Sequence, residues 1–226
     1  MQDKDFMLDV KSFLSKCGIE GEEFFDKSQK LMRHILEENK KYNLTSIKDE
    51  REFWIKHICD SASIFLFYRD LIRDDSEVCD IGSGAGFPAF IIALGSKARV
   101  HAVESSQKKA AFIRNTASIL GIRNLEAISW RSEEIDREPE FSGRYDIITA
   151  RAVGKSEKIC AGSSNMISKQ GSYIFYKTPS SLEAELAELR SLKPNFKWQT
   201  SEQFDLPMEM GKRIFIQGCK IERRQI

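Results

Sequence analysis

The feature that most constrains this chain is a glycine-rich stretch, residues 78–88, which reads Val-Cys-Asp-Ile-Gly-Ser-Gly-Ala-Gly-Phe-Pro. Its apolar start predicts a buried strand that runs into a turn and then a helix. Glycine has no Cβ, so a turn built from Gly82, Gly84 and Gly86 lets a ligand approach the backbone closely. The helix after it presents free N–H groups at its start. The stretch predicts a nucleoside-like ligand at a strand end; a glycine turn without a ligand is the alternative.

The glycine spacing separates two classes of ligand. The dinucleotide fingerprint is G-x-G-x-x-G, with the pyrophosphate at the helix start. Here the pattern is D-x-G-x-G-x-G, and Phe87 stands at the expected third position. Asp80, before the first glycine, is poorly suited to a pyrophosphate but accepts a hydrogen bond from an amine. The variant resembles motif I of the S-adenosylmethionine (AdoMet) methyltransferases, whose ligand carries an amino-acid end and no phosphate. A nicotinamide enzyme is the least favoured alternative.

Composition narrows the class of protein. The chain has 226 residues and is 41% hydrophobic, which is enough for a packed core. Lys and Arg number 35 against 34 Asp and Glu, so any basic surface for nucleic acid must be local. Five scattered cysteines form no C-x-x-C pair, which argues against a disulfide framework and a metal site. No apolar run approaches the ~20 residues of a membrane helix. We therefore expect a cytoplasmic protein with no metal and no membrane segment.

The periodicity of the chain changes near residue 76. Amphipathic helices are predicted over 4–16, 21–41 and 50–68, and these form a helical extension, residues 1–75. From there on, strands and helices alternate, which is typical of a parallel α/β sheet. We expect strands over 77–81, 98–103, 125–129, 145–149, 171–176, 196–203 and 212–221, and helices over 87–95, 107–120, 155–168 and 181–192. The region 76–226 therefore predicts a Rossmann-like, mostly parallel seven-stranded sheet.

Polar residues follow several of these strands. Glu104 ends the second strand at the distance from the glycines where such folds place an acid on ribose hydroxyls. Ser132 and Glu133 follow the third strand, where a loop would meet an adenine ring. Arg151 follows the fourth strand and Lys177 the fifth. Ligands of open α/β sheets bind at the carboxyl ends of the strands, so we expect these residues around one pocket.

The acceptor of a methyl group is narrowed by what the chain lacks. Amino-methylating DNA enzymes usually carry Asp/Asn-Pro-Pro-Tyr/Phe after the fourth strand, but this chain has Ala-Arg-Ala-Val over 150–153. Methylation of a pyrimidine C5 needs a nucleophilic cysteine in an active-site loop, whereas Cys160 lies inside a predicted helix. No histidine follows His101, so a histidine base in a late loop is excluded. What remains suits a nucleophile that needs no deprotonation, such as guanine N7. Three cations are available to steer a phosphate or hydrogen-bond guanine O6, although each alone is more typical of a surface charge: Arg151, Lys177 and Arg213.

His57 and Asp60 lie three residues apart in the predicted helix 50–68, so they share one face of it. We interpret them as a polar contact at an element boundary rather than as a catalytic pair.

Five short motifs follow one another along the chain. They are Tyr42-Asn43-Leu44-Thr45, His57 with Asp60-Ser61, residues 80–88, Glu104-Ser105 and Ala150-Arg151-Ala152. The glycine stretch alone is shared by many methyltransferases, whereas the order of all five is much more specific. Together they resemble the bacterial 16S ribosomal RNA guanine-N7 methyltransferases, formerly called glucose-inhibited division protein B. The likeness covers about residues 25 to 216.

The resemblance implies a class I AdoMet-dependent methyltransferase fold with an N-terminal helical extension. It also implies AdoMet as donor and a guanosine of 16S rRNA in the small ribosomal subunit as acceptor. We assign Arg151 as the catalytic residue beside the methyl group and the incoming base. The residues assigned to AdoMet are Asp80, Gly82, Gly84, Gly86, Phe87, Glu104, Ser132, Glu133 and Arg151. Those assigned to the substrate are Asn43, Lys177 and Arg213.

The chain departs from the family pattern in three places: Ala89 replaces a frequent Gly, Ala150 a usual Ser, and Thr178 a Gly. These departures bear on the substrate loops more than on AdoMet binding. Two other functions remain open at this point. One is a small-molecule methyltransferase on the same fold, and the other is a non-catalytic module that binds AdoMet or RNA. For the rRNA methyltransferase we expect a monomer.

Overall fold

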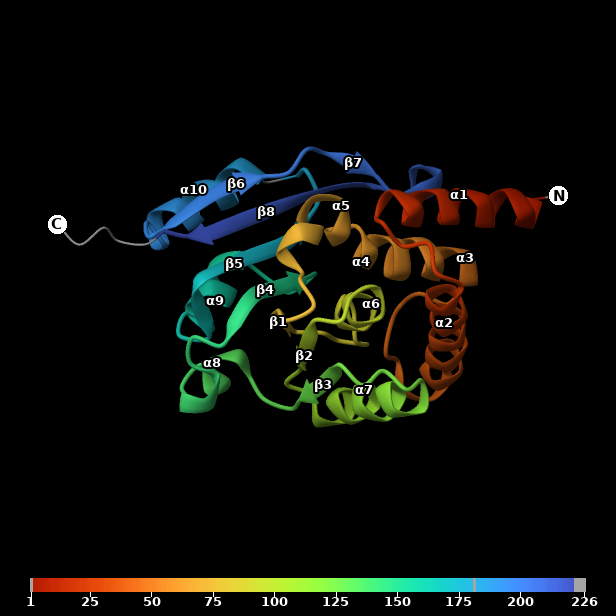
Figure 1. The fold of residues 1–226 in the computed structure, drawn as a ribbon, viewed down its shortest axis with the longest axis horizontal. Coiled ribbons are helices and arrows are strands. Elements are labelled where there is room, and N and C mark those ends of the chain that lie inside the picture. Colours follow the sequence, from red (N-terminus) through yellow and green to blue (C-terminus); the bar gives the residue numbers. More distant parts are fainter. Residues whose placement is uncertain (1, 181, 222–226) are drawn as a thin grey trace.

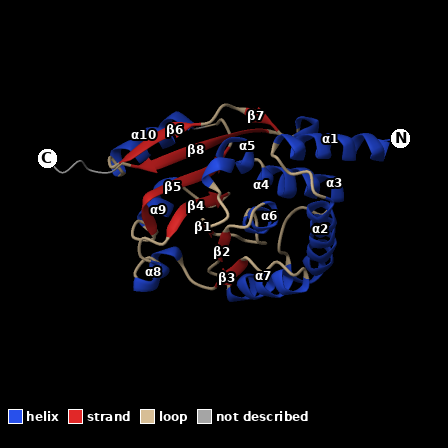
Figure 2. Ribbon diagram, in the orientation of Figure 1, coloured by secondary structure: helices blue, strands red, loops and turns tan. Residues whose placement is uncertain are grey.

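The protein is a three-layer α/β structure, described for residues 2–180 and 182–221 in a computed structural model. A central sheet has the strand order β3-β2-β1-β4-β5-β8-β6, and a short β7 pairs with β8 outside this path. Figure 1 shows α6, α7 and the N-terminal helices on one side of the sheet, and α8 and α9 on the other. Figure 2 shows the strands as the centre of the molecule, with helices around them.

The elements alternate as expected from residue 77 onward. The strands are β1 (Glu77–Ile81), β2 (Arg99–Val103), β3 (Leu125–Ile128), β4 (Tyr145–Arg151), β5 (Ile167–Lys177), β6 (Phe196–Thr200), β7 (Phe204–Asp205) and β8 (Lys212–Lys220). The helices are α1 (Gln2–Lys16), α2 (Glu22–Tyr42), α3 (Glu50–Phe53), α4 (Asp60–Ala62), α5 (Ile64–Tyr68), α6 (Ala89–Gly95), α7 (Gln107–Ile119), α8 (Ser132–Ile135), α9 (Ser156–Ala161) and α10 (Leu182–Leu192).

Strand β1 lies at the point where the strand order reverses. It pairs in parallel with β2 on one side and with β4 on the other. Such a switch point leaves a crevice at the carboxyl ends of the strands, because the two connections leave in opposite directions. Ile81 pairs with Val103, and Asp80 pairs with Thr149. This register brings the glycine stretch next to Glu104 and to the end of β4.

The predicted fold class is confirmed, since β1 to β5 are parallel to one another and β8 runs antiparallel to its neighbours β5, β6 and β7. The main path has the seven predicted strands, and the two-residue β7 was not predicted. The helix predicted over 155–168 is wrong beyond Ala161, because β5 already begins at Ile167. The Asp136 carboxylate accepts the backbone N–H groups of Asn165 and Met166 and holds them out of a helix.

The predicted helix 50–68 is also not one regular helix. Between α3 and α4, residues Trp54–Cys59 form a π-helix, whose wider turns are frequent at functional sites. His57 lies in this segment and Asp60 directly after it. Both side chains are buried, although aspartates are mostly exposed. The irregular segment therefore carries two polar groups into the interior.

One hydrophobic core joins the helical extension to the sheet. It contains Val10 of α1, Leu31 of α2 and Ile58 of the π-helix together with Val78 of β1 and Ile91 of α6. The boundary between the helical extension, residues 1–75, and the region 76–226 stays a prediction. The shared core shows that the two regions pack against each other. In the described part of the chain, no helix is both long and apolar enough to cross a bilayer.

Replacing Leu31 by Ala tests the shared core. The side chain is fully buried, so we expect the free energy of unfolding to fall by about 2–5 kcal/mol in a single urea transition. Leu8→Ala on the exposed side of α1 is the matched control and should change it by no more than about 0.5 kcal/mol. A separate early transition for the extension would contradict a common core.

Candidate functional site

The glycine loop after β1 depends on glycine for conformation and for space. Gly82, Gly84 and Gly86 all have positive φ angles, a region that other residues rarely adopt. A Cβ on Gly82 would lie 2.5 Å from a methyl carbon of Val153, and one on Gly86 would overlap the ring of Phe90. Gly82 and Gly84 line a cavity, while Gly86 packs against α6. The loop therefore opens its backbone to the cavity at two of its three glycines.

Glu104, directly after β2, faces the glycine loop. Its Oε2 accepts the N–H of Gly84 at 2.9 Å, and its Oε1 accepts the N–H of Ser106 at 2.9 Å. The residue is 8% exposed and lines the same cavity. A carboxylate offers about four acceptor positions, so this group holds the loop and still has positions for ligand hydroxyls.

Asp80 lies fully buried beneath the loop. Its Oδ2 accepts the N–H of Ala89 at 3.2 Å, at the start of α6, and its Oδ1 has no partner among the described residues. Burial raises the pKa of this carboxyl to about 7. A buried acceptor without a partner is costly, so a donor such as an amine near the loop would stabilise the charged form.

The first of two adjacent cavities has a volume of about 690 Å³, within the range of small-molecule sites. We call it the loop cavity. Four segments that are distant in sequence line it: the Tyr42–Thr45 motif, the π-helix, the glycine loop with Glu104, and the turn after β4. Among its lining residues are Thr45, His57, Gly84, Phe87, Glu104 and Arg151.

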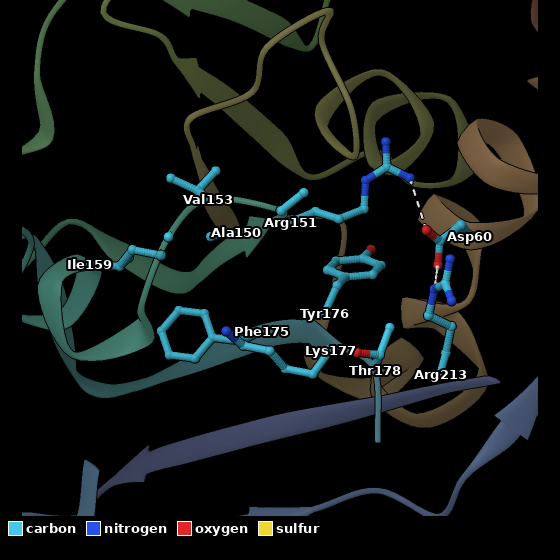
Figure 3. Close-up of a pocket in the computed structure, with 12 residues that line it drawn as sticks. Asp60, Ala150, Arg151, Val153, Ile159, Phe175, Tyr176, Lys177, Thr178 and Arg213 are labelled. Carbon is cyan, nitrogen blue, oxygen red and sulfur yellow. Dashed lines mark hydrogen bonds and ion pairs between the residues drawn. The ribbon is translucent and has the colours of Figure 1, made fainter. Parts of the chain in front are cut away.

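The second cavity, of about 270 Å³, lies across residues 151–154 from the first and shares them with it. We call it the cationic cavity. Its walls come from the ends of β4, β5 and β8, and three of its residues carry positive charge. Figure 3 shows these three, Arg151, Lys177 and Arg213, with Tyr176 and Thr178 around the same space.

Asp60 binds two of these cations at once. Its Oδ2 lies 3.2 Å from Nη1 of Arg151, and its Oδ1 lies 2.9 Å from Nε of Arg213, as the dashed lines in Figure 3 mark. Arg151 also donates from Nη1 to the carbonyl oxygen of Lys56 at 2.7 Å. All three charged side chains are largely buried, which makes their pairing strong and its loss costly.

His57 contacts the other terminal nitrogen of Arg151. Its Nδ1 lies 3.0 Å from Nη2 of Arg151, and its Nε2 lies 2.8 Å from Oγ1 of Thr45. The imidazole stacks on the Phe87 ring at 4.5 Å between centroids. Burial, with the charge of Arg151 as a second cause, lowers the pKa of His57 to about 3, so the ring is neutral at physiological pH.

The acid and base groups near the cationic cavity are already engaged. Asp60 is the one carboxylate among the described residues that line it, and both of its oxygens hold arginines. Lys177 is paired with Glu185 at 2.6 Å. His57 faces Arg151 with its Nδ1. No group in this set is free to take a proton from an acceptor molecule.

The structure brings most of the predicted site residues together. Gly82, Gly84, Phe87 and Glu104 line the loop cavity, and Arg151 lines both cavities. Lys177 and Arg213 line the cationic cavity. Asp80 and Gly86 lie behind the glycine loop and support it.

Three further predicted residues line neither cavity. Ser132 and Glu133 begin α8 and face Gly162 at the end of α9. Asn43 is an exposed residue that ends α2 with a left-handed backbone, next to the lining residues Leu44 and Thr45. Ser132 and Glu133 were predicted at the site because they follow β3, but α8 directs both side chains toward α9.

Thr45, His57 and Asp60 were not assigned to the site from the sequence, yet all three line the loop cavity. The three-residue spacing of His57 and Asp60 was the available signal. Both side chains contact Arg151, a partner some 90 residues away that spacing could not reveal.

Comparison with protein families identifies the chain. The family model described as rRNA small subunit methyltransferase G matches residues 25–212. The chain belongs to this family. It is an AdoMet-dependent rRNA methyltransferase with a class I fold.

Members of the rRNA small subunit methyltransferase G family from several bacteria resemble the chain over most of its length. The Geobacillus sp. protein is 34% identical over 82% of this chain and 79% of its own. The Lactobacillus helveticus protein is 32% identical over 69% of this chain and 65% of its own, and the Lactobacillus acidophilus protein is 28% identical over 99% and 92%. Each of these relatives is named ribosomal RNA small subunit methyltransferase G.

Solved structures agree on the fold. The O-methyltransferase from Bacillus cereus, solved in complex with SAH, superposes with a TM-score of 0.60 at 14% identity, over 84% of this chain and 91% of that one. A SAM-dependent O-methyltransferase from Thermotoga maritima gives 0.58 at 17% identity, over 85% and 73%. At this identity, the likeness concerns the class I fold alone.

Replacing Asp60 by Ala should destabilise this methyltransferase by about 3–5 kcal/mol, because two largely buried arginines lose their shared partner. Urea unfolding measures the change. Asp75→Ala removes an exposed, arginine-paired aspartate and is the matched control, expected within about 0.5 kcal/mol of the wild type. Equal effects of the two substitutions would show that the Asp60 pairs contribute no more than a surface pair.

Asp80 should make the ligand-free protein less stable as the pH rises. An unfolded aspartate loses its proton near pH 4, whereas the folded one keeps it until about pH 7, so its favourable contribution is lost across that interval. Asp80→Asn should therefore gain stability relative to the wild type between about pH 5 and about pH 7 in urea titrations. Asp75→Asn is the control. If the free energies of unfolding of the wild type and Asp80→Asn differ by the same amount at every pH, the raised pKa of Asp80 is contradicted.

Proposed function

We propose that the chain transfers a methyl group from AdoMet to N7 of a guanosine in 16S rRNA of the small ribosomal subunit. The observation that carries this proposal is the cationic cavity, in which the acid and base groups of the described lining are all engaged by neighbours. Oxygen and exocyclic amine acceptors must lose a proton during methylation. Guanine N7 attacks through its own in-plane lone pair and needs no base.

The loop cavity fits AdoMet in three respects. Asp80, beneath the glycine loop that lines this cavity, has a buried oxygen without a partner among the described residues, which suits the amine of the methionine end. Glu104 keeps acceptor positions for ribose hydroxyls at the end of β2. Gly82 and Gly84 leave backbone exposed to the ligand. When bound, AdoMet supplies a methyl group on a positively charged sulfur.

The cationic cavity fits the guanine edge. Arg151 uses three of its five N–H donors on Lys56, His57 and Asp60, which leaves two without a partner in the described part of the chain. Because Arg151 lines both cavities, we assign it beside the methyl group and guanine O6. Arg213 and Lys177 line the far wall and suit the phosphate of the same nucleotide.

With these residue roles, the protein accelerates methyl transfer by aligning the guanine with the methyl donor. Methyl transfer is an in-line displacement, so the residues must hold the acceptor close to the donor and in line with it. Residues 151–154 form the shared wall of the two cavities and therefore set the relative position of base and donor. Lys56 and Lys109 at the loop cavity add positive charge that suits a polyanionic acceptor.

We keep the remaining assignments as parts of the proposal. Ser132 and Glu133 belong to the loop on the adenine side, although their side chains face Gly162 and line neither cavity. Gly86 supports the glycine loop, and Asn43 contacts RNA beside the loop cavity. We also propose that the protein acts as a monomer in the cytoplasm. Its five cysteines are free thiols, which fits a reducing compartment.

The rival function, methylation of a small molecule, predicts turnover without RNA. Incubation of the protein with labelled AdoMet and small subunits that lack the modification distinguishes the two. We expect label at a guanine N7 of 16S rRNA, seen by reduction and strand cleavage at the methylated guanosine. Label in free nucleosides but not in subunits would favour the rival.

Arg151→Ala should reduce methylation of these subunits by roughly 100-fold while the fold is retained, because a misplaced acceptor reacts slowly. Arg213 keeps its own contact with Asp60 in this variant. Circular dichroism and the melting temperature report the fold, and initial rates report turnover. Arg73→Ala removes an exposed arginine and should leave the rate unchanged. Equal rates for the two variants would remove Arg151 from the site.

A further inference from the structure

His57 is the side chain at which three separate motifs meet. It lies in the π-helical segment and contacts Thr45 of the Tyr42–Thr45 motif, Phe87 of the glycine loop and Arg151 at the end of β4. The residue is 9% exposed, yet it lines the loop cavity. It therefore connects the wall of the donor site to the arginine that both cavities share.

The direction of its hydrogen bonds follows from the chemistry of its partners. A guanidinium donates and never accepts, so Nδ1 of His57 must present a lone pair to Nη2 of Arg151. The neutral ring then carries its proton on Nε2, which donates to Oγ1 of Thr45. Thr45 is itself fixed, because its backbone N–H and carbonyl both bond the side chain of Asn39 in α2.

The ring is also held in its plane. Phe87 stacks on one face with an angle of 9° between the rings, and Phe53 packs edge-on at 4.8 Å between centroids. Rotation of the imidazole would break these contacts along with both hydrogen bonds. Because Nδ1 is occupied by Arg151, His57 is poorly placed to act as a proton acceptor for a substrate.

We propose that His57 is a positioning residue for methyl transfer: its Nδ1 fixes the guanidinium of Arg151 between the two cavities, and its ring is braced by the glycine loop. The inference rests on the proposed function in one respect, the contact of Arg151 with the acceptor. The Asp60 carboxylate and the Lys56 carbonyl oxygen both accept from Nη1 of Arg151, whereas Nδ1 of His57 accepts from Nη2. His57 therefore supplies the contact at the second terminal nitrogen, and contacts at both nitrogens fix the orientation of the planar group.

A pair of substitutions separates the acceptor atom from the ring. His57→Asn keeps an acceptor close to the position of Nδ1 but removes the stacked ring, whereas His57→Phe keeps the ring and removes the acceptor. We expect His57→Phe to lower kcat at saturating AdoMet and subunits by roughly 10- to 100-fold, with the Kd for AdoMet close to the wild-type value. His57→Asn should recover most of that rate.

Melting temperatures of both variants are measured, and the rates are compared well below the lower one. If His57→Phe is as fast as the wild type, or if His57→Asn is as slow as His57→Phe, the proposal is overturned. A wild-type enzyme that labels RNA at another position would refute N7 methylation. The ratio of the methylation rates of the two variants at that position would still report on the role of His57.

Nitrogen NMR of the wild type gives a readout independent of activity. The chain has three histidines, so substitution of His34 and His101 assigns the signals of His57. We expect a neutral ring protonated at Nε2 near pH 7, and a change of its Nδ1 signal in Arg151→Lys. A charged ring, or one protonated at Nδ1, would show that His57 does not accept from Arg151 and would overturn the proposal.

Discussion

The buried carboxylate of Asp60 is the interaction on which the rest of the site depends. A charge out of water is tolerated only when it is paired, and here two arginines from β4 and β8 share it. These two strands are not neighbours, since β5 lies between them. Asp60 thus ties the irregular helical segment to both of these strands, and it lines the loop cavity as well as the cationic cavity.

The same pairing decides which chemistry the cationic cavity supports. Both oxygens of Asp60 are engaged by arginines, so neither is left to remove a proton. A lysine paired with a glutamate and a histidine that accepts from an arginine are occupied in the same way. The site therefore favours an acceptor that brings its own lone pair. In such a site, the reaction is accelerated by alignment of acceptor and donor. That alignment depends on side chains that are each held in place by more than one contact.

The glycine loop and the strand ends could be predicted because they depend on short-range chemistry. Glycine is the residue that adopts positive φ without strain, so the spacing of the glycines is enough to indicate the class of ligand. Alternation of strands and helices predicted the parallel sheet and placed Glu104 beside the loop. The end of α9 could not be predicted, because the side chain of Asp136, distant in sequence, holds residues 165 and 166 out of the helix.

The sequence by itself determined the fold class, the donor loop and the order of motifs that marks the family. It could not show that Thr45, His57, Phe87 and Arg151 touch one another, because their contacts join segments that lie up to about a hundred residues apart. The tertiary structure decided this, and it also turned Ser132 and Glu133 away from both cavities. The reason is physical: backbone preference is local, whereas the pairing of buried charges is settled only when the strands and the helical extension pack together.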